Sequence, residues 1–104
     1  MDILLIFKCL ADENRLRIIQ LLSQRKYCVR ALSKELGISE PAVSQHIRLL
    51  KNAGLLEIGD KNGYHIHYAV NKNHLMLLSE EIKLLADSVR ESRVCGGNCK
   101  GETK

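Results

Sequence analysis

Apolar residues recur at helical spacing through the first part of the chain. A helix over residues 2–10 would be apolar on nearly every side. Such a helix must be buried, and at this end of the chain we expect a partner subunit to cover it. A second helix is indicated after Asp12, a residue type that often caps helices. Its inward face carries apolar residues about three positions apart, widened by two neighbours: Leu16, Ile19 and Leu22, with Ile18 and Leu21.

A third helix is predicted over residues 27–37. Val29, Leu32 and Leu36 share one helical face and are expected to point inward. Gly37 is a natural stop at the C-terminus of this helix. The turn that follows is short, because new helix signals begin at residue 39.

The fourth helix is predicted to begin at Ser39 and to end at Gly54. Ser39 is the expected N-cap, and Pro41 lies in the first turn, where its missing N–H costs nothing. Two consecutive helices joined by a short turn that contains glycine form a helix-turn-helix signature. Apolar residues at i, i+4 and i+7 mark the core face: Val43, Ile47 and Leu50.

The period of the pattern then changes from helix to strand. Asn62-Gly63 is a strong hairpin turn signal, and the residues after it alternate. His65 and His67 are expected on the solvent side of the second strand, opposite the set Tyr64, Ile66, Tyr68 and Val70. Two histidines at this spacing could bind a metal, but no third ligand lies nearby in the sequence. We therefore interpret them as exposed residues of a β-hairpin wing.

A long helix is predicted from about residue 73 toward residue 93. Its apolar residues follow steps of 3, 4, 3 and 4, which is a heptad-like seam. Little more than two heptads are present, so we expect the helix to pack on its copy in a dimer. The predicted dimer interface combines this seam with the first helix: Ile3, Leu4, Phe7, Leu75, Leu78, Ile82, Leu85 and Val89.

These elements predict a mainly α fold with a small β-hairpin wing. The order is α-α-α-α-β-β-α, a dimeric winged helix-turn-helix, and a chain of 104 residues is one domain by length. We expect residues 1–93 to form a domain for DNA binding and dimerisation. Residues 94–104 hold two of the four cysteines and are expected to be a flexible tail.

The positive charge is concentrated in the middle of the chain. Residues 23–72 carry eight basic against four acidic residues, a difference equal to the whole net charge of +4. A basic surface there would attract a polyanion such as DNA, although a small surplus of lysines could merely keep the protein soluble. The sequence has no apolar run of about 18 residues and no basic signal-peptide start. We therefore expect no membrane partner and a cytoplasmic location, where thiols stay mostly reduced.

The outer face of the fourth helix has the composition of a DNA-reading surface. Gln45 can pair with adenine, and Arg48 with guanine or phosphate. At the hairpin tip, Lys61 is expected to reach a phosphate. The alternative is that these are ordinary solvated residues. The complete predicted DNA-contact set is Ser39, Glu40, Pro41, Ala42, Ser44, Gln45, His46, Arg48, Lys61 and Asn62.

Two stretches carry a family resemblance: CLADENRLRIIQLL and LSKELGISEPAVSQHIRLLKNAGLLEIGDKNGYHIHYAV. They resemble the ArsR/SmtB family of small winged-helix repressors, over roughly residues 5–93. The resemblance implies a homodimer held by its first and last helices. It also implies binding to an imperfect palindrome in double-stranded operator DNA and release by an effector. Effectors in the family are often metal or metalloid ions; some members sense redox or sulfur species, and some have none.

The chain departs from the family at both usual metal sites. One family site has two cysteines as C-x-C at the start of the third helix, whereas this chain has Cys28 followed by Val29 and Arg30. Another family site uses histidines on the last helix. His74 is present there, but Leu84 stands where the second histidine is expected. Neither site is predicted to be complete.

The remaining candidate is the C-x3-C pair Cys95 and Cys99 near the end of the chain. Two glycines between them let the backbone fold back so that both sulfurs can face one ion. Thiolates select soft ions, and trivalent arsenic or antimony takes three of them. Cys28 is the first choice for a third ligand, and Cys9 is less favoured because it fits a buried small hydrophobe.

The sequence therefore predicts a DNA-binding repressor that arsenite or antimonite releases, with no constitutive cofactor. Alternatives within the same fold are a thiol-based redox or reactive-sulfur sensor, with a disulfide among these cysteines, and a regulator without an effector. The tail thiols could also be inert. The sequence contains no nucleophile–base constellation and no phosphate-binding loop, so an enzyme is not predicted.

Overall fold

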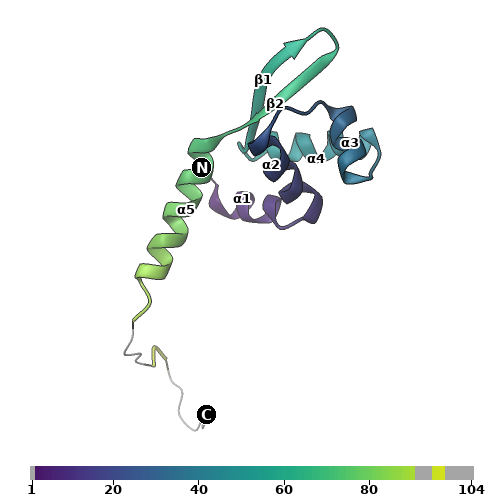
Figure 1. The fold of residues 1–104 in the computed structure, drawn as a ribbon. Coiled ribbons are helices and arrows are strands. Elements are labelled where there is room, and N and C mark those ends of the chain that lie inside the picture. The colour runs from purple at the N-terminus through teal and green to yellow at the C-terminus, as the bar shows by residue number, and fades with distance from the viewer. Residues whose placement is uncertain (1, 91–94, 98–104) are drawn as a thin grey trace.

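The computed structural model describes residues 2–90 and 95–97 of the 104-residue chain. These residues form five helices and one two-stranded antiparallel sheet, in the order predicted. Helices α1 to α4 gather into one body, the hairpin projects from it, and α5 extends away on another side (Figure 1). The bounds are α1 Ile3–Leu10, α2 Glu13–Gln24, α3 Val29–Leu36, α4 Glu40–Asn52, β1 Leu56–Asn62, β2 His65–Val70 and α5 Lys72–Asp87.

Side-chain caps fix where the helices begin. Asp12 Oδ1 accepts from the backbone N–H of Arg15 at 3.0 Å, at the start of α2. Ser39 Oγ accepts from the N–H of Ala42 at 3.2 Å, at the start of α4. Both caps agree with the sequence prediction. Each satisfies a backbone donor that has no partner within its own helix.

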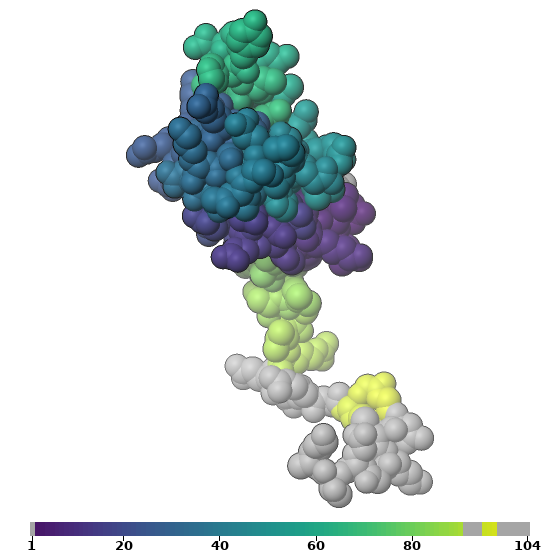
Figure 2. Space-filling view, turned by 90° about the vertical axis from the view of Figure 1, so that its right-hand side faces the viewer, coloured from purple at the N-terminus to yellow at the C-terminus, as the bar shows by residue number. Residues whose placement is uncertain are grey.

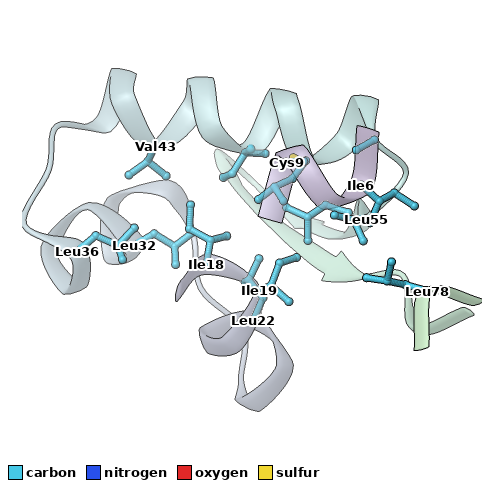
Figure 3. Packing of buried hydrophobic residues seen from close by; sticks show 14 residues of the cluster. Ile6, Cys9, Ile18, Ile19, Leu22, Leu32, Leu36, Val43, Leu55 and Leu78 are labelled. Carbon is cyan, nitrogen blue, oxygen red and sulfur yellow. The ribbon is translucent and has the colours of Figure 1, made fainter. Parts of the chain in front are cut away.

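One apolar cluster holds the four N-terminal helices and the base of the hairpin together. Figure 3 shows its side chains pointing into the space between these elements. Leu16, predicted to face inward, is exposed. The inward face of α2 is centred on Ile18 and Ile19, both buried. The buried set is Ile6, Cys9, Ile18, Ile19, Leu22, Leu32, Leu36, Val43, Ile47, Leu50, Ala53, Leu55, Leu56 and Leu78.

The hairpin turn is one residue later than predicted. Asn62 pairs with His65, so the two loop residues are Gly63 and Tyr64. Gly63 has φ +63°, and within residues 2–90 and 95–97 only glycines have positive φ. A glycine with positive φ at the first loop position is the pattern of a type II′ turn, which suits the twist of a hairpin. Asn62 therefore ends the strand.

A bulge at Gly59 changes the register along the hairpin. Ile58 pairs with Tyr68 but Asp60 pairs with His67, so Gly59 is the extra residue. A Cβ atom at Gly59 would lie 3.0 Å from the carbonyl oxygen of His67. The close approach explains why glycine occupies this position. The bulge also changes which side chains face inward beyond it.

Helix α1 is only half buried in one subunit. Ile6 and Cys9 lie in the core, whereas Leu4, Leu5 and Phe7 are exposed. The sequence predicted a helix buried on all sides with the help of a partner. The single chain therefore covers one side of α1 and leaves an apolar side open.

Helix α5 ends at Asp87, earlier than the predicted end near residue 93. Leu78 is buried and Leu75 packs partly against the core, so the first half of the seam joins α5 to its own domain. Leu85 is 70% exposed. Val89 lies beyond the helix and is exposed as well. The second half of the seam is therefore uncovered in the single chain.

Gly54 is expected to tolerate substitution worse than Gly37, although both have left-handed backbone angles (φ +79° and +69°). Gly37→Ala should lower the free energy of unfolding by about 1 kcal/mol, the cost of backbone strain alone. Gly54→Ala should cost about 2–3 kcal/mol, because its Cβ would lie 2.8 Å from Nε2 of His74. Urea unfolding of the two variants checks this prediction. Equal losses would show that the His74 ring moves aside freely.

Candidate nucleic-acid interface and cysteine sites

The outward face of α4 presents the residues predicted to read DNA. Gln45 and Arg48 are exposed one turn apart, and the Arg48 guanidinium donates a hydrogen bond to Oε1 of Gln45. The two side chains therefore form one polar unit in the free protein. The other exposed members of the predicted set on this helix and its cap are Ser39, Glu40, Pro41 and Ser44, with Ala42 half-buried.

The wing lies beside α4 and adds exposed donors. Lys61 and Asn62 are exposed at the end of β1, next to the hairpin turn. Lys51, which the sequence analysis did not single out, places its ammonium 5.7 Å from the centre of the Tyr68 ring on β2. A cation above an aromatic ring is attracted to it. This contact joins the end of α4 to the wing. Lys51 lies three positions after Arg48, and this helical spacing could have indicated that Lys51 shares the outward face of α4.

An ion-pair cluster ties the wing to the segment after α2. Asp60 Oδ2 lies 2.7 Å from Nζ of Lys26, and Oδ1 lies 2.7 Å from Nδ1 of His67. Hydrogen bonds from Lys26 and then His67 hold the pKa of Asp60 below its ordinary value. Because the Asp60 side chain is 45% exposed, the pairs contribute little to stability. Their main effect is to orient the wing relative to the segment after α2.

The two wing histidines differ, contrary to the sequence prediction. His65 is exposed as expected, but His67 is half-buried and bound to Asp60. The bulge at Gly59 brings Asp60 opposite His67. A regular alternation cannot reveal such a pairing, so the expectation of a free surface residue at position 67 was wrong.

His46 was predicted on the DNA-facing surface of α4, and the structure turns it toward α2. Its ring is half-buried, and Nδ1 lies 3.2 Å from Nη1 of Arg15. Asp12 lies at the same junction and faces Arg15 across 4.0 Å. A hydrogen bond from the backbone N–H of Arg15 is the main cause that holds the pKa of Asp12 below its ordinary value.

Cys9 lies in the core at 6% exposure. Burial raises the pKa of its thiol, and the neighbouring Arg15 guanidinium opposes part of that rise. A buried thiol with a raised pKa is a poor nucleophile and a poor ligand. The structure therefore agrees with the interpretation of Cys9 as a small hydrophobe.

Cys28 is half-buried at the N-terminal end of α3. It lines a hollow of about 250 Å³ together with Arg30, Glu40 and His65. The hollow therefore lies between α3, the start of α4 and the wing. In residues 2–90 and 95–97, no three His, Cys, Asp or Glu side chains form a metal-binding group.

Cys95 is exposed beyond the end of α5 and is disulfide-bonded. Cys99, the second member of the predicted pair, lies outside the described residues. Figures 1 and 2 place residues 95–97 at the opposite end of the molecule from the wing and α3. The structure of one chain therefore does not bring Cys28 and Cys95 together.

His74 on α5 packs inward, against Gly54. Its Nδ1 is buried and has no hydrogen-bond partner in the part of the chain that the structure describes. The expectation that the usual histidine site on the last helix is incomplete still rests on Leu84 in the sequence. Among the described helices, none has the length and apolar character that crossing a membrane requires.

The arrangement of α3, a glycine turn, α4 and a β-hairpin defines a winged helix-turn-helix domain. Residues 12–57 match the family model described as "Bacterial regulatory protein, arsR family". The chain belongs to this ArsR family of transcriptional regulators. Members of the family regulate transcription, so the protein is not an enzyme.

Relatives and solved structures agree with this assignment. The arsenical resistance operon repressor of Escherichia coli is 33% identical over 106 residues, covering 95% of this chain and 90% of that protein. A transcriptional repressor SmtB homolog of Synechocystis is 35% identical over 86 residues, 83% of this chain but only 62% of that protein. An ArsR-like regulator from Rhodococcus superposes with a TM-score of 0.72 at 25% identity, covering 82% of this chain and 79% of that one. Reduced HlyU from Vibrio cholerae gives 0.64 at 28% identity, covering 81% and 84%.

Proposed function

We propose that the protein is a homodimeric repressor that binds operator DNA and is released by a thiophilic metal or metalloid, arsenite or antimonite first among them. The observation that carries the proposal is the exposed pair Gln45 and Arg48 on α4, beside the wing of a chain that belongs to the ArsR family. A recognition helix of this kind reads base edges in the major groove with its N-terminal part. The wing would add backbone contacts through Lys61.

A second copy of the chain is the proposed cover for the open apolar sides of α1 and α5. A 104-residue chain has a small core, and a dimer interface adds apolar burial that one subunit cannot supply. The two helices would set the distance between the two copies of α4, which must match half-sites about one DNA turn apart. The exposed apolar residues on these helices are Leu4, Leu5, Phe7, Met76, Leu77, Ile82, Leu84 and Leu85.

Reduced Cys95 and Cys99 are the proposed ion ligands, joined by Cys28. Arsenite takes three thiolates, and the arsenical resistance operon repressor of Escherichia coli is among the relatives. Since α3, which begins directly after Cys28, and residues 95–97 lie at opposite ends of the molecule (Figure 1), the third thiolate would come from the partner subunit. Such a link would act on the spacing of the recognition helices, because it would hold α5 of one subunit against α3 of the other.

A second candidate is a thiol-based redox sensor, and the disulfide at Cys95 favours it. Two thiolates would lose two electrons to an oxidant such as a peroxide and form one S–S bond. Formation of this disulfide would act through α5 on the spacing of the two copies of α4, as proposed for the ion. The two candidates share the DNA-binding surface and differ only in the effector.

Arg48→Ala is expected to weaken operator binding by about 1–3 kcal/mol, because it removes a bidentate base contact or a phosphate contact. Fluorescence anisotropy with labelled operator at fixed salt measures the change. Lys83→Ala is the matched control, since it removes one positive charge from the exposed face of α5. An Arg48→Ala protein that binds operator as tightly as the control would remove α4 from the proposed interface.

A further inference from the structure

Arg15 joins three helices at one point. Its Nε donates to the backbone carbonyl oxygen of Cys9 at 2.7 Å, near the end of α1. Its Nη1 lies 3.2 Å from Nδ1 of His46 on α4, and Asp12 at the start of α2 lies 4.0 Å away. The Arg15 side chain is 17% exposed, so water offers it few alternative partners. The junction fixes α4 against the ends of α1 and α2.

The chemistry of the pair determines the tautomer of His46. A guanidinium has only donors and stays protonated in proteins. Nδ1 of His46 must therefore accept, which places the single imidazole proton on Nε2. A proton on Nδ1 would remove the acceptor. A doubly protonated ring would also place a second positive charge beside Arg15, where Asp12 lies 4.0 Å from the guanidinium. The neighbouring thiol on α1, Cys9, is neutral because burial raises its pKa.

We propose that His46 is a positioning residue: as the neutral Nε2–H tautomer it accepts from Arg15 and so fixes the orientation of the recognition helix. It acts through Arg15 and does not touch DNA itself. The proposal rests on the proposed DNA-binding function. It names a residue that sets the orientation of α4 in the proposed DNA interface. It also identifies a route between α1, which carries part of the proposed dimer face, and α4.

Replacing His46 by asparagine or by leucine separates the role of hydrogen-bond acceptor for Arg15 from a simple effect of helix propensity. Asparagine can present a carbonyl oxygen close to the position of Nδ1, whereas leucine leaves the Arg15 Nη1 donor without its acceptor. We expect His46→Asn to bind operator within about threefold of wild type, and His46→Leu to lose about tenfold. Helix propensity predicts the opposite order, since leucine favours a helix more than asparagine does. Lys83→Asn and Lys83→Leu, on the exposed face of α5, are the matched controls, since Lys83 lies outside the proposed DNA interface.

Two measurements test the proposal. Nitrogen-15 NMR of the imidazole in the free protein should show Nε2 protonated and Nδ1 unprotonated at neutral pH, a result that needs no DNA. Operator titrations at several salt concentrations should then show unchanged salt dependence for both His46 variants. Nδ1 protonated in the free protein, or equal losses for the two variants, would overturn the proposal. If wild type binds no operator, the proposed function fails instead, and the NMR result still tests whether His46 accepts from Arg15.

Discussion

Leu50→Ala is expected to lower the free energy of unfolding by about 2–5 kcal/mol, the range for removing a buried leucine side chain. Leu50 is 0% exposed and lies on the core face of α4. Its carbonyl oxygen also accepts from the N–H of Leu55 at 2.9 Å, which holds the turn into β1 in place. The cavity would therefore loosen the recognition helix and the base of the wing together. Small domains have only about 5–15 kcal/mol of stability, so the loss would also reduce operator binding at elevated temperature.

Leu49→Ala is the matched control because it makes the same chemical change one position along α4. Leu49 is 37% exposed, so the variant should lose about 1 kcal/mol or less. Urea denaturation of both proteins, at one protein concentration because of the proposed dimer, compares the two losses. Similar losses at the two positions would show that α4 is not packed as described.

The variant with both Cys95→Ser and Cys99→Ser is expected to stay on operator DNA when arsenite is added. The reduced wild-type protein should lose operator affinity by about 5–150-fold, the usual range of coupling between two sites. The serine variant cannot make the soft S–As bonds, so it should show no loss. Both proteins should bind the operator equally without arsenite, because residues 95–97 lie at the other end of the molecule from α4 and the wing (Figure 1).

Single replacements then assign the third thiolate. Cys28→Ser should reduce arsenite release if the partner subunit's α3 contributes a ligand, whereas Cys9→Ala should leave release unchanged. Release of the double serine variant by arsenite would remove the tail pair as the sensing site. Release of wild type by a peroxide but not by arsenite would favour the redox sensor.

The sequence predicted the local structure well because local structure depends on local pattern. The cap at Ser39 and the core positions Val43, Ile47 and Leu50 place α4 within one residue of its observed start. The same pattern identified Gln45 and Arg48 as outward residues, since a helix that buries one face exposes the opposite one. The outward face of α4 could therefore be identified before any packing was known.

Pairs far apart in the sequence could not be read in this way. Arg15 and His46 are 31 positions apart, and Lys26 and Asp60 are 34 apart. His46 lies at the edge of the inward face of α4, where the period alone does not decide between solvent and a neighbouring helix. The position of His67 depended on one extra residue in β1, which no periodic pattern marks.

The sequence by itself determined the order of the helices and strands, their caps and the outward face of α4, because hydrophobic period and capping act within a few residues. Only the tertiary structure decided that His46 faces Arg15, that Asp60 holds His67 and Lys26, and that Cys28 lies far from Cys95. Those relations depend on how the elements pack, and packing is set by the shape of the whole core. Only the tertiary structure also showed that α1 and α5 each keep an open apolar side, since one chain buries only part of each helix.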